Sequence, residues 1–331
     1  MRVFAYEFVT GGGLVGQPLP AGLAREADMM LRALLCDLAA VPGVQLVTSR
    51  DPRLGELTGT EVLATREGEE SLASYHRGLA AADAAWPTAP EAAGVLEQLA
   101  QLTLTEGKLL LGCPPDAIRL SASKLHTAAV LAGAGIPTVP TFARASGMPP
   151  APGRWVVKPD DGAGCDSTEV VPHWREAQER LQAGNGRLVA QPWVEGDPRS
   201  LSLLCAAGQA VLLSVNQQCM RIRNGRLSLV GLGVNAVPDP SGHYGALARS
   251  VAAAIPSLRG YVGIDFIQTE EGPVVLEINP RLTTSYCGLR SALGVNVAEL
   301  VLELSRSGML PTLPRRRAAQ RIDLALEAPG D

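Results

Sequence analysis

Lysine is rare in this chain, and two of its lysines stand where a fixed positive charge would do chemistry. The 331 residues contain 29 basic side chains, of which only Lys108, Lys124 and Lys158 are lysines. A lysine ammonium is a compact point charge that the planar guanidinium of arginine does not replace. We therefore interpret Lys124 and Lys158 as candidates for sites that require an ammonium, and Lys108 as an ordinary surface residue.

The segment around Lys158 has the composition of a phosphate-binding strand and loop. Lys158 ends the apolar run "RWVVKP" and is followed by "DDGAGCDS", with Gly162 and Gly164 in the loop. A cation beside exposed backbone N–H groups can hold a polyphosphate. The pattern differs from a Walker A loop, because G-x-x-x-x-G-K-[ST] occurs nowhere in the chain.

Three oxygen-bearing side chains lie on two apolar segments near the C-terminus. Asp265 lies in "GIDFIQT", and Glu277 and Asn279 lie two residues apart in "VVLEINPR", so the latter pair shares one face of a strand. Burying such groups together is costly unless a cation joins them, and Mg²⁺ prefers oxygen ligands. The alternative is that the two carboxylates pair with arginines such as Arg281.

The surrounding elements predict an α/β protein. Residues 2–9, 23–38 and 44–50 read as strand, helix and strand, the start of a parallel sheet. A helix begins near Ser121 or Ser123 and ends near Gly135. From residue 200 onward strands dominate, with a hairpin turn at Asn224-Gly225, and the tail after Pro311 is expected to be peripheral.

Composition excludes several classes of function. A net charge of −4 gives no reason to expect a nucleic acid or an anionic membrane surface as partner. No segment resembles a signal peptide or a membrane span. The six cysteines are scattered without a C-x-x-C pair, as is typical of reduced thiols in the cytoplasm, and the four histidines lack metal-ligand spacing. We therefore expect a cytoplasmic protein.

In this order, the motifs resemble the ATP-grasp superfamily of carboxylate–amine ligases over roughly residues 110 to 305. The resemblance rests on "SASKLHTAAVLAGAGIPTVPT", "VVKPDDGAG", "QPWVEGDPRSLSLL", "GIDFI" and "LEINPR". It implies an ATP-grasp fold preceded by a Rossmann-like pre-ATP-grasp domain. The predicted division is residues 1–112 for that substrate-side domain, 113–192 for a small lid subdomain, 193–312 for a large subdomain with the metal site, and 313–331 for the tail.

The resemblance also implies roles for individual residues. Lys124 and Lys158 would hold ATP phosphates beneath Gly162 and Gly164, and Arg281 would face the transferring phosphoryl group. The hinge and metal ligands complete the implied set: Gln191, Trp193 and Val194 at the adenine, Asp197 or Glu195 at the ribose, and Asp265, Glu277 and Asn279 at one or two Mg²⁺ ions, for which Mn²⁺ could substitute. Ser123 and Gln191 depart from the family's usual Asp and Glu, and Pro198 stands where the acidic ribose ligand is expected.

The implied reaction joins two small molecules at the expense of ATP. A carboxylate attacks the γ-phosphate, and an amine captures the acyl phosphate, releasing ADP and phosphate; such chemistry needs positioned charges rather than a protein nucleophile. The chain most resembles the subgroup that includes tyramine–glutamate ligase of methanofuran-type cofactor biosynthesis, which implies an amino acid carboxylate such as glutamate. Residues 283–286 would lie near that substrate. Assembly into a homo-oligomer is left open.

The opening segment "YEFVTGGGLVGQPLP" contains a G-x-G-x-x-G spacing that would suit a nicotinamide-dependent oxidoreductase. Pro18 and Pro20 follow the last glycine directly, so no helix can begin there to face a pyrophosphate. We instead interpret residues 11–13 as a candidate substrate loop, with Glu7 or Glu26 as partners for an amine. A regulatory protein that binds nucleotide without turnover is the third hypothesis.

Overall fold

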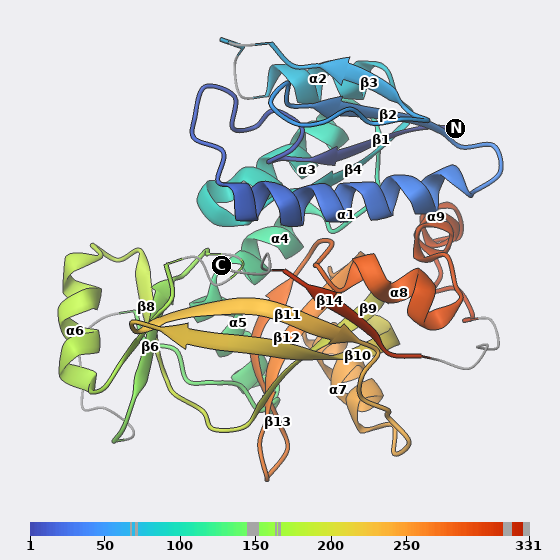
Figure 1. Cartoon of the computed structure of the whole chain (residues 1–331). Helices are drawn as coiled ribbons and strands as arrows, with labels where there is room; N and C mark the ends of the chain where they lie inside the picture. The colour runs from blue at the N-terminus through green and yellow to red at the C-terminus, as the bar shows by residue number, and fades with distance from the viewer. Residues whose placement is uncertain are drawn as a thin grey trace.

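Two separate sheets organise the chain in a computed structural model, which describes residues 1–66, 68–69, 72–143, 152–162, 164, 167–313 and 320–326. Helix α1 (Ala21–Ala39) lies between them, with the first sheet on one side and the second sheet with its helices on the other (Figure 1). The two parts are therefore joined along a broad junction.

The first sheet is parallel throughout, as the sequence predicts. Its strand order is β3-β2-β1-β4-β5. The strands are β1 (Arg2–Glu7), β2 (Gln45–Arg50), β3 (Glu61–Ala64), β4 (Ala84–Thr88) and β5 (Leu109–Leu110). Helices α2 (Ala73–Ala80) and α3 (Val95–Thr105) follow β3 and β4, and the short helix η1 (Ala92–Gly94) precedes α3. The carboxyl ends of β1 and β4 therefore lie at the same edge of this sheet.

Strand β1 is buried on both faces, because helices cover both sides of the sheet. Val3 and Ala5 belong to the core cluster that includes α1, whereas Phe4 and Tyr6 belong to the cluster that includes α2 and α3. This alternation follows from the two-residue period of a strand. The strand is shorter than predicted, since the chain turns after Glu7.

Within the described residues, the second sheet is antiparallel and has nine strands. Its main order is β13-β12-β9-β10-β11-β7-β6-β8, and β14 pairs with β11. The strands are β6 (Trp155–Pro159), β7 (Glu169–Val171), β8 (Leu188–Pro192), β9 (Asp197–Ala206), β10 (Gln209–Arg223), β11 (Arg226–Val234), β12 (Gly260–Gln268), β13 (Pro273–Asn279) and β14 (Ile322–Ala325). The expected turn at Asn224-Gly225 joins β10 and β11.

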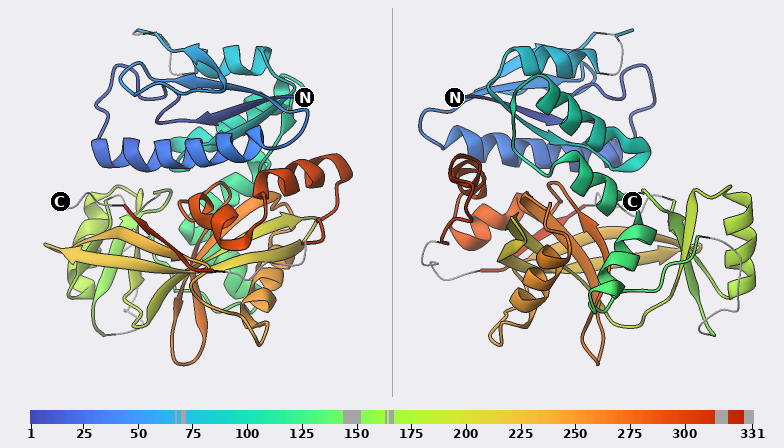
Figure 2. Two further views of the ribbon diagram at one scale, coloured as in Figure 1. Left: turned by 45° about the vertical axis from the view of Figure 1, so that its right-hand side comes forward. Right: turned by 180° about the vertical axis from the view of Figure 1, so that it is seen from behind.

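Helices cover this sheet and connect it to the first part (Figure 2). They are α4 (Pro115–Ala122), α5 (Lys124–Gly133), α6 (Trp174–Ala183), α7 (His243–Ala254), α8 (Tyr286–Leu293) and α9 (Val297–Ser307). Asp37 of α1 accepts hydrogen bonds from the Tyr286 hydroxyl and the Arg290 guanidinium of α8. Polar contacts thus fix α1 to α8.

One expectation about the C-terminus is wrong. The tail was expected to be peripheral, yet Ile322 to Ala325 pair with Val234 to Gly231 of β11. Leu324 also packs against the core cluster of α1 and α8. The described part of the tail therefore extends the second sheet, because its alternating apolar residues cover an exposed strand edge. In the described part of the chain, no helix has the length and apolar character needed to cross a bilayer.

Candidate active site

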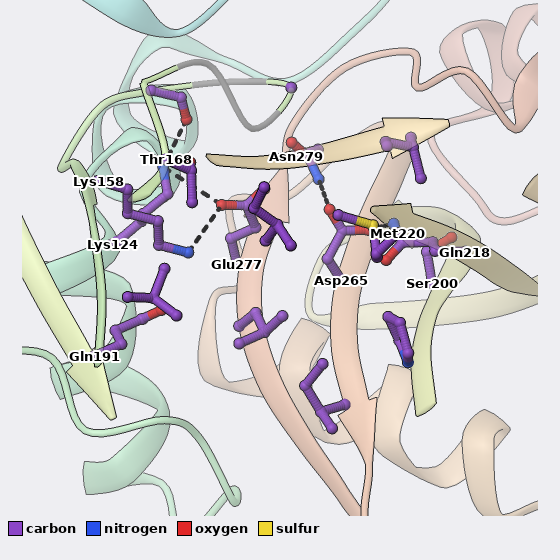
Figure 3. A pocket seen from close by; sticks show the side chains of 18 of the residues that line it. Lys124, Lys158, Thr168, Gln191, Ser200, Gln218, Met220, Asp265, Glu277 and Asn279 are labelled. Atoms are coloured by element: carbon purple, nitrogen blue, oxygen red, sulfur yellow. Dashed lines mark hydrogen bonds and ion pairs between the residues drawn. The ribbon is translucent and has the colours of Figure 1, made fainter. Parts of the chain in front are cut away.

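A cavity of about 620 Å³ opens between the β6–β8 strands and the strands β10 to β13. Figure 3 shows that Lys124, Lys158 and Gln191 approach it from one side and Asp265, Glu277 and Asn279 from the other. The predicted site residues among its lining are Lys124, Lys158, Gly162, Gly164, Gln191, Trp193, Val194, Asp265, Glu277, Asn279 and Arg281. Residues up to 157 positions apart thus line one cavity.

The start of helix α5 fixes Lys124. Ser123 caps this helix, since its Oγ accepts a hydrogen bond from the His126 N–H at 3.1 Å. The same Oγ donates to Asp160 at 2.7 Å, and the second Asp160 oxygen accepts from the Leu125 N–H at 2.9 Å. Ser123 stands where the family often has Asp, and the Asp160 carboxylate supplies the negative charge at this helix N-terminus instead.

Both rare lysines point at one carboxylate. The Lys124 Nζ lies 3.4 Å from Glu277 Oε2 and donates to the Gly162 carbonyl at 2.6 Å, and the Lys158 Nζ lies 3.8 Å from the same Oε2. Burial raises the pKa of Glu277, but the two ammonium groups outweigh this effect and lower it to about 2. Glu277 therefore stays ionised and keeps two positive charges at the cavity wall.

Asp265 faces Glu277 across the β12–β13 ladder. Its Oδ1 accepts a hydrogen bond from Gln218 at 3.0 Å, and its Oδ2 accepts one from Asn279 at 3.2 Å. Burial raises the pKa of Asp265, and the neighbouring Glu277 charge raises it further, to about 7. Two carboxylates facing each other without a cation between them favour protonation of one, which is the electrostatic condition that a bound cation relieves.

The donor set fits Mg²⁺ bound together with a phosphate. Mg²⁺ is typically held by one or two carboxylates, with substrate phosphates and waters completing its six ligands. Asp265, Glu277 and the amide oxygen of Asn279 provide such a partial set. Within the described ranges, no group of three histidine, cysteine, aspartate or glutamate side chains could hold a metal alone. The alternative pairing with Arg281 is wrong for Glu277, because the lysines occupy that position.

The hinge places an apolar slot beside these charges. Gln191 is buried and donates to Thr141 at 2.9 Å, while Trp193 and Val194 line the cavity. The backbone N–H of Trp193 donates a hydrogen bond to the Arg154 carbonyl at 2.9 Å. An adenine base bound here would therefore have to use other backbone groups of the hinge. The walls of the slot include side chains that sequence reasoning missed, namely Val156, Met220, Ile222, Leu227, Leu229, Ile267 and Leu276. In sequence these are indistinguishable from ordinary strand core.

The structure does not bring the predicted ribose ligands into the cavity. Asp197 is outside the lining and pairs with Arg199 at 2.9 Å. Glu195 is also outside it, and its carboxylate pairs with Arg154 at 2.7 Å. Both side chains are largely exposed, because Glu195 lies in the turn between β8 and β9 and Asp197 is the first residue of β9.

The part of the chain that carries the parallel sheet is called the first domain below. Arg281 lies at the end of the cavity nearest this domain. Its guanidinium lines the cavity and donates two hydrogen bonds to Glu91, at 2.9 and 3.0 Å. Thr283, Thr284 and Ser285 continue this wall. Tyr286 was expected beside the substrate, but it begins α8 and its side chain is buried against α1 instead.

Glu26 of α1 is the one charged side chain that the first domain contributes to the described cavity lining. Its carboxylate accepts a hydrogen bond from the Thr284 hydroxyl. Among the described residues, no arginine or lysine nitrogen is recorded within 4 Å of this carboxylate, and Arg281 interacts with it only at longer range. A half-buried carboxylate in this position is suited to a cationic group of a bound molecule.

The glycine loop at residues 11–13 is buried instead of lining the cavity. A Cβ at Gly11 would lie 2.5 Å from the Tyr6 ring, and one at Gly13 would lie 2.3 Å from the Phe8 ring. Glu7 is also buried, and its carboxylate accepts hydrogen bonds from the N–H groups of Val9 and Thr10. The glycines are therefore required by packing, and of the two proposed amine partners only Glu26 reaches the cavity.

Comparisons with known proteins agree with this geometry. An ATP-grasp domain model matches residues 121–285, and a pre ATP-grasp 3 domain model matches residues 44–118. Tyramine–L-glutamate ligase of Methanocaldococcus jannaschii is 28% identical over 222 residues, which are 67% of this chain and 62% of that protein. The ligase of the same name from Methanocaldococcus fervens is 25% identical over 307 residues, 91% of this chain and 93% of that protein.

Solved structures show the same fold. An ATP-grasp superfamily protein from Archaeoglobus fulgidus has a TM-score of 0.74 at 22% identity, covering 98% of this chain and 92% of its own. L-amino acid ligase from Bacillus licheniformis has a TM-score of 0.64 at 15% identity, covering 93% and 74%. The two domain models together match four strands of the first sheet and every strand of the second except β14. The chain therefore belongs to the ATP-grasp superfamily, with a pre-ATP-grasp domain at its N-terminal side.

Proposed function

We propose that the protein activates an amino acid carboxylate, glutamate or a close relative, as an acyl phosphate and transfers it to an amine, releasing ADP and phosphate. The observation that carries this proposal is one continuous cavity wall. Lys124, Lys158 and Glu277 lie on one part of it, and Arg281 and Glu26 lie on another. The first group suits a nucleotide polyphosphate, and the second suits a substrate with both charges.

In this proposal Lys124 and Lys158 bind the phosphates of ATP beside Gly162 and Gly164. Asp265, Glu277 and Asn279 would hold Mg²⁺, which would neutralise phosphate charge when bound. Arg281 faces the developing charge of the transferred phosphoryl group. No side chain of the protein needs to form a covalent intermediate, because the reaction proceeds once the two substrates are aligned.

Glu26 gives the second half of the site its specificity in this proposal. A carboxylate with a threonine hydroxyl at its side can bind a substrate ammonium by a charge-assisted hydrogen bond. The names of the relatives support an amino acid donor and an aromatic amine acceptor, such as tyramine. A methanofuran-type pathway, the domain boundaries given above, the cytoplasmic location and a homo-oligomeric state remain predictions.

The test is ADP release by the purified protein with Mg²⁺ and a panel of amino acids and amines. Hydroxylamine replaces the amine in a second assay and traps an acyl phosphate as a hydroxamate. We expect ADP release to depend on both substrates and the hydroxamate to form with the amino acid alone. Binding of ATP without ADP release across the panel would instead indicate a regulatory nucleotide-binding protein.

The Glu26→Gln variant tests the ammonium contact. Loss of a charge-assisted hydrogen bond predicts a KM about 10-fold or more higher for the substrate whose ammonium it binds. If hydroxamate formation is impaired, that substrate is the amino acid; if only the full reaction is impaired, it is the amine. An unchanged KM in both assays would remove Glu26 from the site. Gln178→Glu, on the distant helix α6, is a control variant that leaves the cavity intact.

A further inference from the structure

A short segment of the first domain, residues 91–94, contacts two elements of the candidate active site at once. It follows β4 and includes the single turn η1 that precedes α3. Glu91 accepts both hydrogen bonds from the Arg281 guanidinium. Two residues later, the Ala93 N–H donates to the Asp161 carboxylate at 2.9 Å. Arg281 and Asp161 come from opposite sides of the cavity.

The contact between Glu91 and Arg281 is a buried, two-point ion pair. The side chains are 5% and 11% exposed, respectively, and 190 residues separate them. The parallel fork of two hydrogen bonds fixes the plane of the guanidinium as well as its position. Burial lowers the pKa of Arg281, but Glu91 outweighs this effect and raises it, so the charge is permanent. Glu91 is not among the residues that line the cavity, and any effect it has on bound substrates acts through Arg281.

Ala93 has a left-handed backbone conformation, which residues other than glycine rarely adopt. Ala93 has φ +54° and Gly94 has φ +69°, so two successive residues are left-handed. This conformation is unfavourable for a non-glycine residue, and here it accompanies the hydrogen bond from the Ala93 N–H to Asp161. Asp161 directly precedes Gly162, whose carbonyl accepts from Lys124. The segment therefore reaches the phosphate-binding loop through one intervening residue.

We propose that residues 91–94 form a positioning bridge: Glu91 orients Arg281, and the Ala93 N–H holds Asp161, so that one segment of the first domain positions both sides of the active site. This proposal rests on the proposed ligase activity. Glu91 is a positioning residue and not a catalytic residue, since its carboxylate contacts Arg281 and no part of the cavity.

Docking of the two domains does not by itself require this bridge. Asp37 of α1 already pairs with Arg290 of α8 at 3.1 Å and accepts the Tyr286 hydroxyl bond. That contact lies outside the cavity lining. The chain thus contains one junction beside the cavity and one remote from it, and the remote pair supplies a matched control.

The experiment compares Glu91→Gln and Asp161→Ala with two control variants. Glu91→Gln should lower kcat about 10- to 100-fold, because a misplaced guanidinium loses its alignment with the reacting group. Asp161→Ala should lower kcat about 3- to 10-fold, the effect of one hydrogen bond. Binding of a non-hydrolysable ATP analogue should weaken less than about threefold in both variants, because neither Glu91 nor Asp161 lines the cavity. Arg290→Gln and the exposed Asp116→Ala should retain the wild-type kcat.

The Glu91→Gln and Asp161→Ala double variant separates a bridge from two independent contacts. If both residues act through one rigid segment, the effect of the second change on kcat is smaller in the presence of the first. If the losses of kcat in the two single variants multiply in the double variant, the proposal is overturned. A loss of kcat in Arg290→Gln as large as that in Glu91→Gln would also overturn it. If Glu91→Gln fails to fold, Glu91→Asp replaces it in the cycle. Absence of ADP release by the wild-type protein with every substrate would contradict the proposed function itself. Failure of the bridge proposal is distinguished from this, because it requires an active wild-type protein.

Discussion

Asp265 and Glu277 face each other as a direct pair in the antiparallel ladder of β12 and β13, both on the cavity side. Like charges directly opposite in a sheet are destabilising, and this pair has been placed beside two lysines and an asparagine. Without a cation this arrangement lowers the stability of the fold, but it is suited to binding one. A substitution that removes one of the two charges should therefore raise stability and lower activity.

Asp265→Asn should therefore raise the melting temperature of the metal-free protein while lowering its activity. Removing the repulsion is worth on the order of 1 kcal/mol, or about 2–4 °C for a domain of this size. ADP release should fall about 100-fold or more, with a higher Mg²⁺ concentration needed for half-maximal rate. Thermal unfolding and Mg²⁺ titration of ADP release measure the two effects. Glu270→Gln, in the exposed turn of the same hairpin, should change neither; a Mg²⁺ dependence unaltered in Asp265→Asn would exclude this residue as a ligand.

The two rare lysines should not tolerate replacement by arginine. Lys124→Arg and Lys158→Arg should each lower kcat/KM for ATP about 10-fold or more, since a planar guanidinium cannot take the place of a compact ammonium 3–4 Å from Glu277. The alanine variants should lose about 100- to 1000-fold. Lys108, which lies outside the cavity, provides the matched control in Lys108→Arg. Full activity in Lys158→Arg would show that position 158 needs only a positive charge.

Gly12 should be required for stability and not for substrate binding. It has φ +102°, and a Cβ would lie 2.4 Å from the Thr65 Cγ2. Gly12→Ala should cost about 1–3 kcal/mol of unfolding free energy in chemical denaturation. Gly16→Ala, also left-handed but with nothing within 4 Å of the added Cβ, should cost only about 1 kcal/mol. A raised KM for the carboxylate substrate at unchanged stability would return the loop to the active site.

Glu7 should make stability fall as the pH rises toward neutrality. Burial raises its pKa, and the hydrogen bonds from Thr10 and Val9 and the charge of Arg281 only partly oppose this, leaving it at about 7 against an ordinary 4.5. The native state therefore holds a proton that the unfolded chain has lost over this interval. Its contribution is fully present below about pH 4.5 and is lost as the pH rises through 7, with a slope of up to ~1.4 kcal/mol per pH unit.

The difference in unfolding free energy between the wild type and Glu7→Gln isolates this group. That difference should decline between pH 5 and 7.5, because glutamine cannot titrate. Urea unfolding at half-unit intervals of pH measures it. A constant difference across this range would show that Glu7 is ionised in the native state, held so by its three hydrogen bonds.

Some parts of the site could be read from the sequence because they depend on local periodicity. Glu277 and Asn279 share a face since strands repeat every two residues, and Asp265 precedes them by the length of one hairpin. The rarity of lysine selected Lys124 and Lys158, and both reach Glu277. Residue type and spacing were sufficient here because β12 and β13 are adjacent in sequence and in the sheet.

Other parts depended on how the two domains pack, which no local pattern encodes. The spacing of Gly11, Gly13 and Gly16 looked like a ligand loop, but the aromatic side chains of Tyr6 and Phe8 fill the space beside Gly11 and Gly13. Glu91 carried no signal in the sequence, and its role follows only from lying against Arg281, 190 residues away. The sequence by itself determined which charges meet at the centre of the cavity, Lys124, Lys158 and Glu277. The tertiary structure decided which residues of the first domain complete the site, because contacts across the domain junction depend on the relative placement of two separately formed cores.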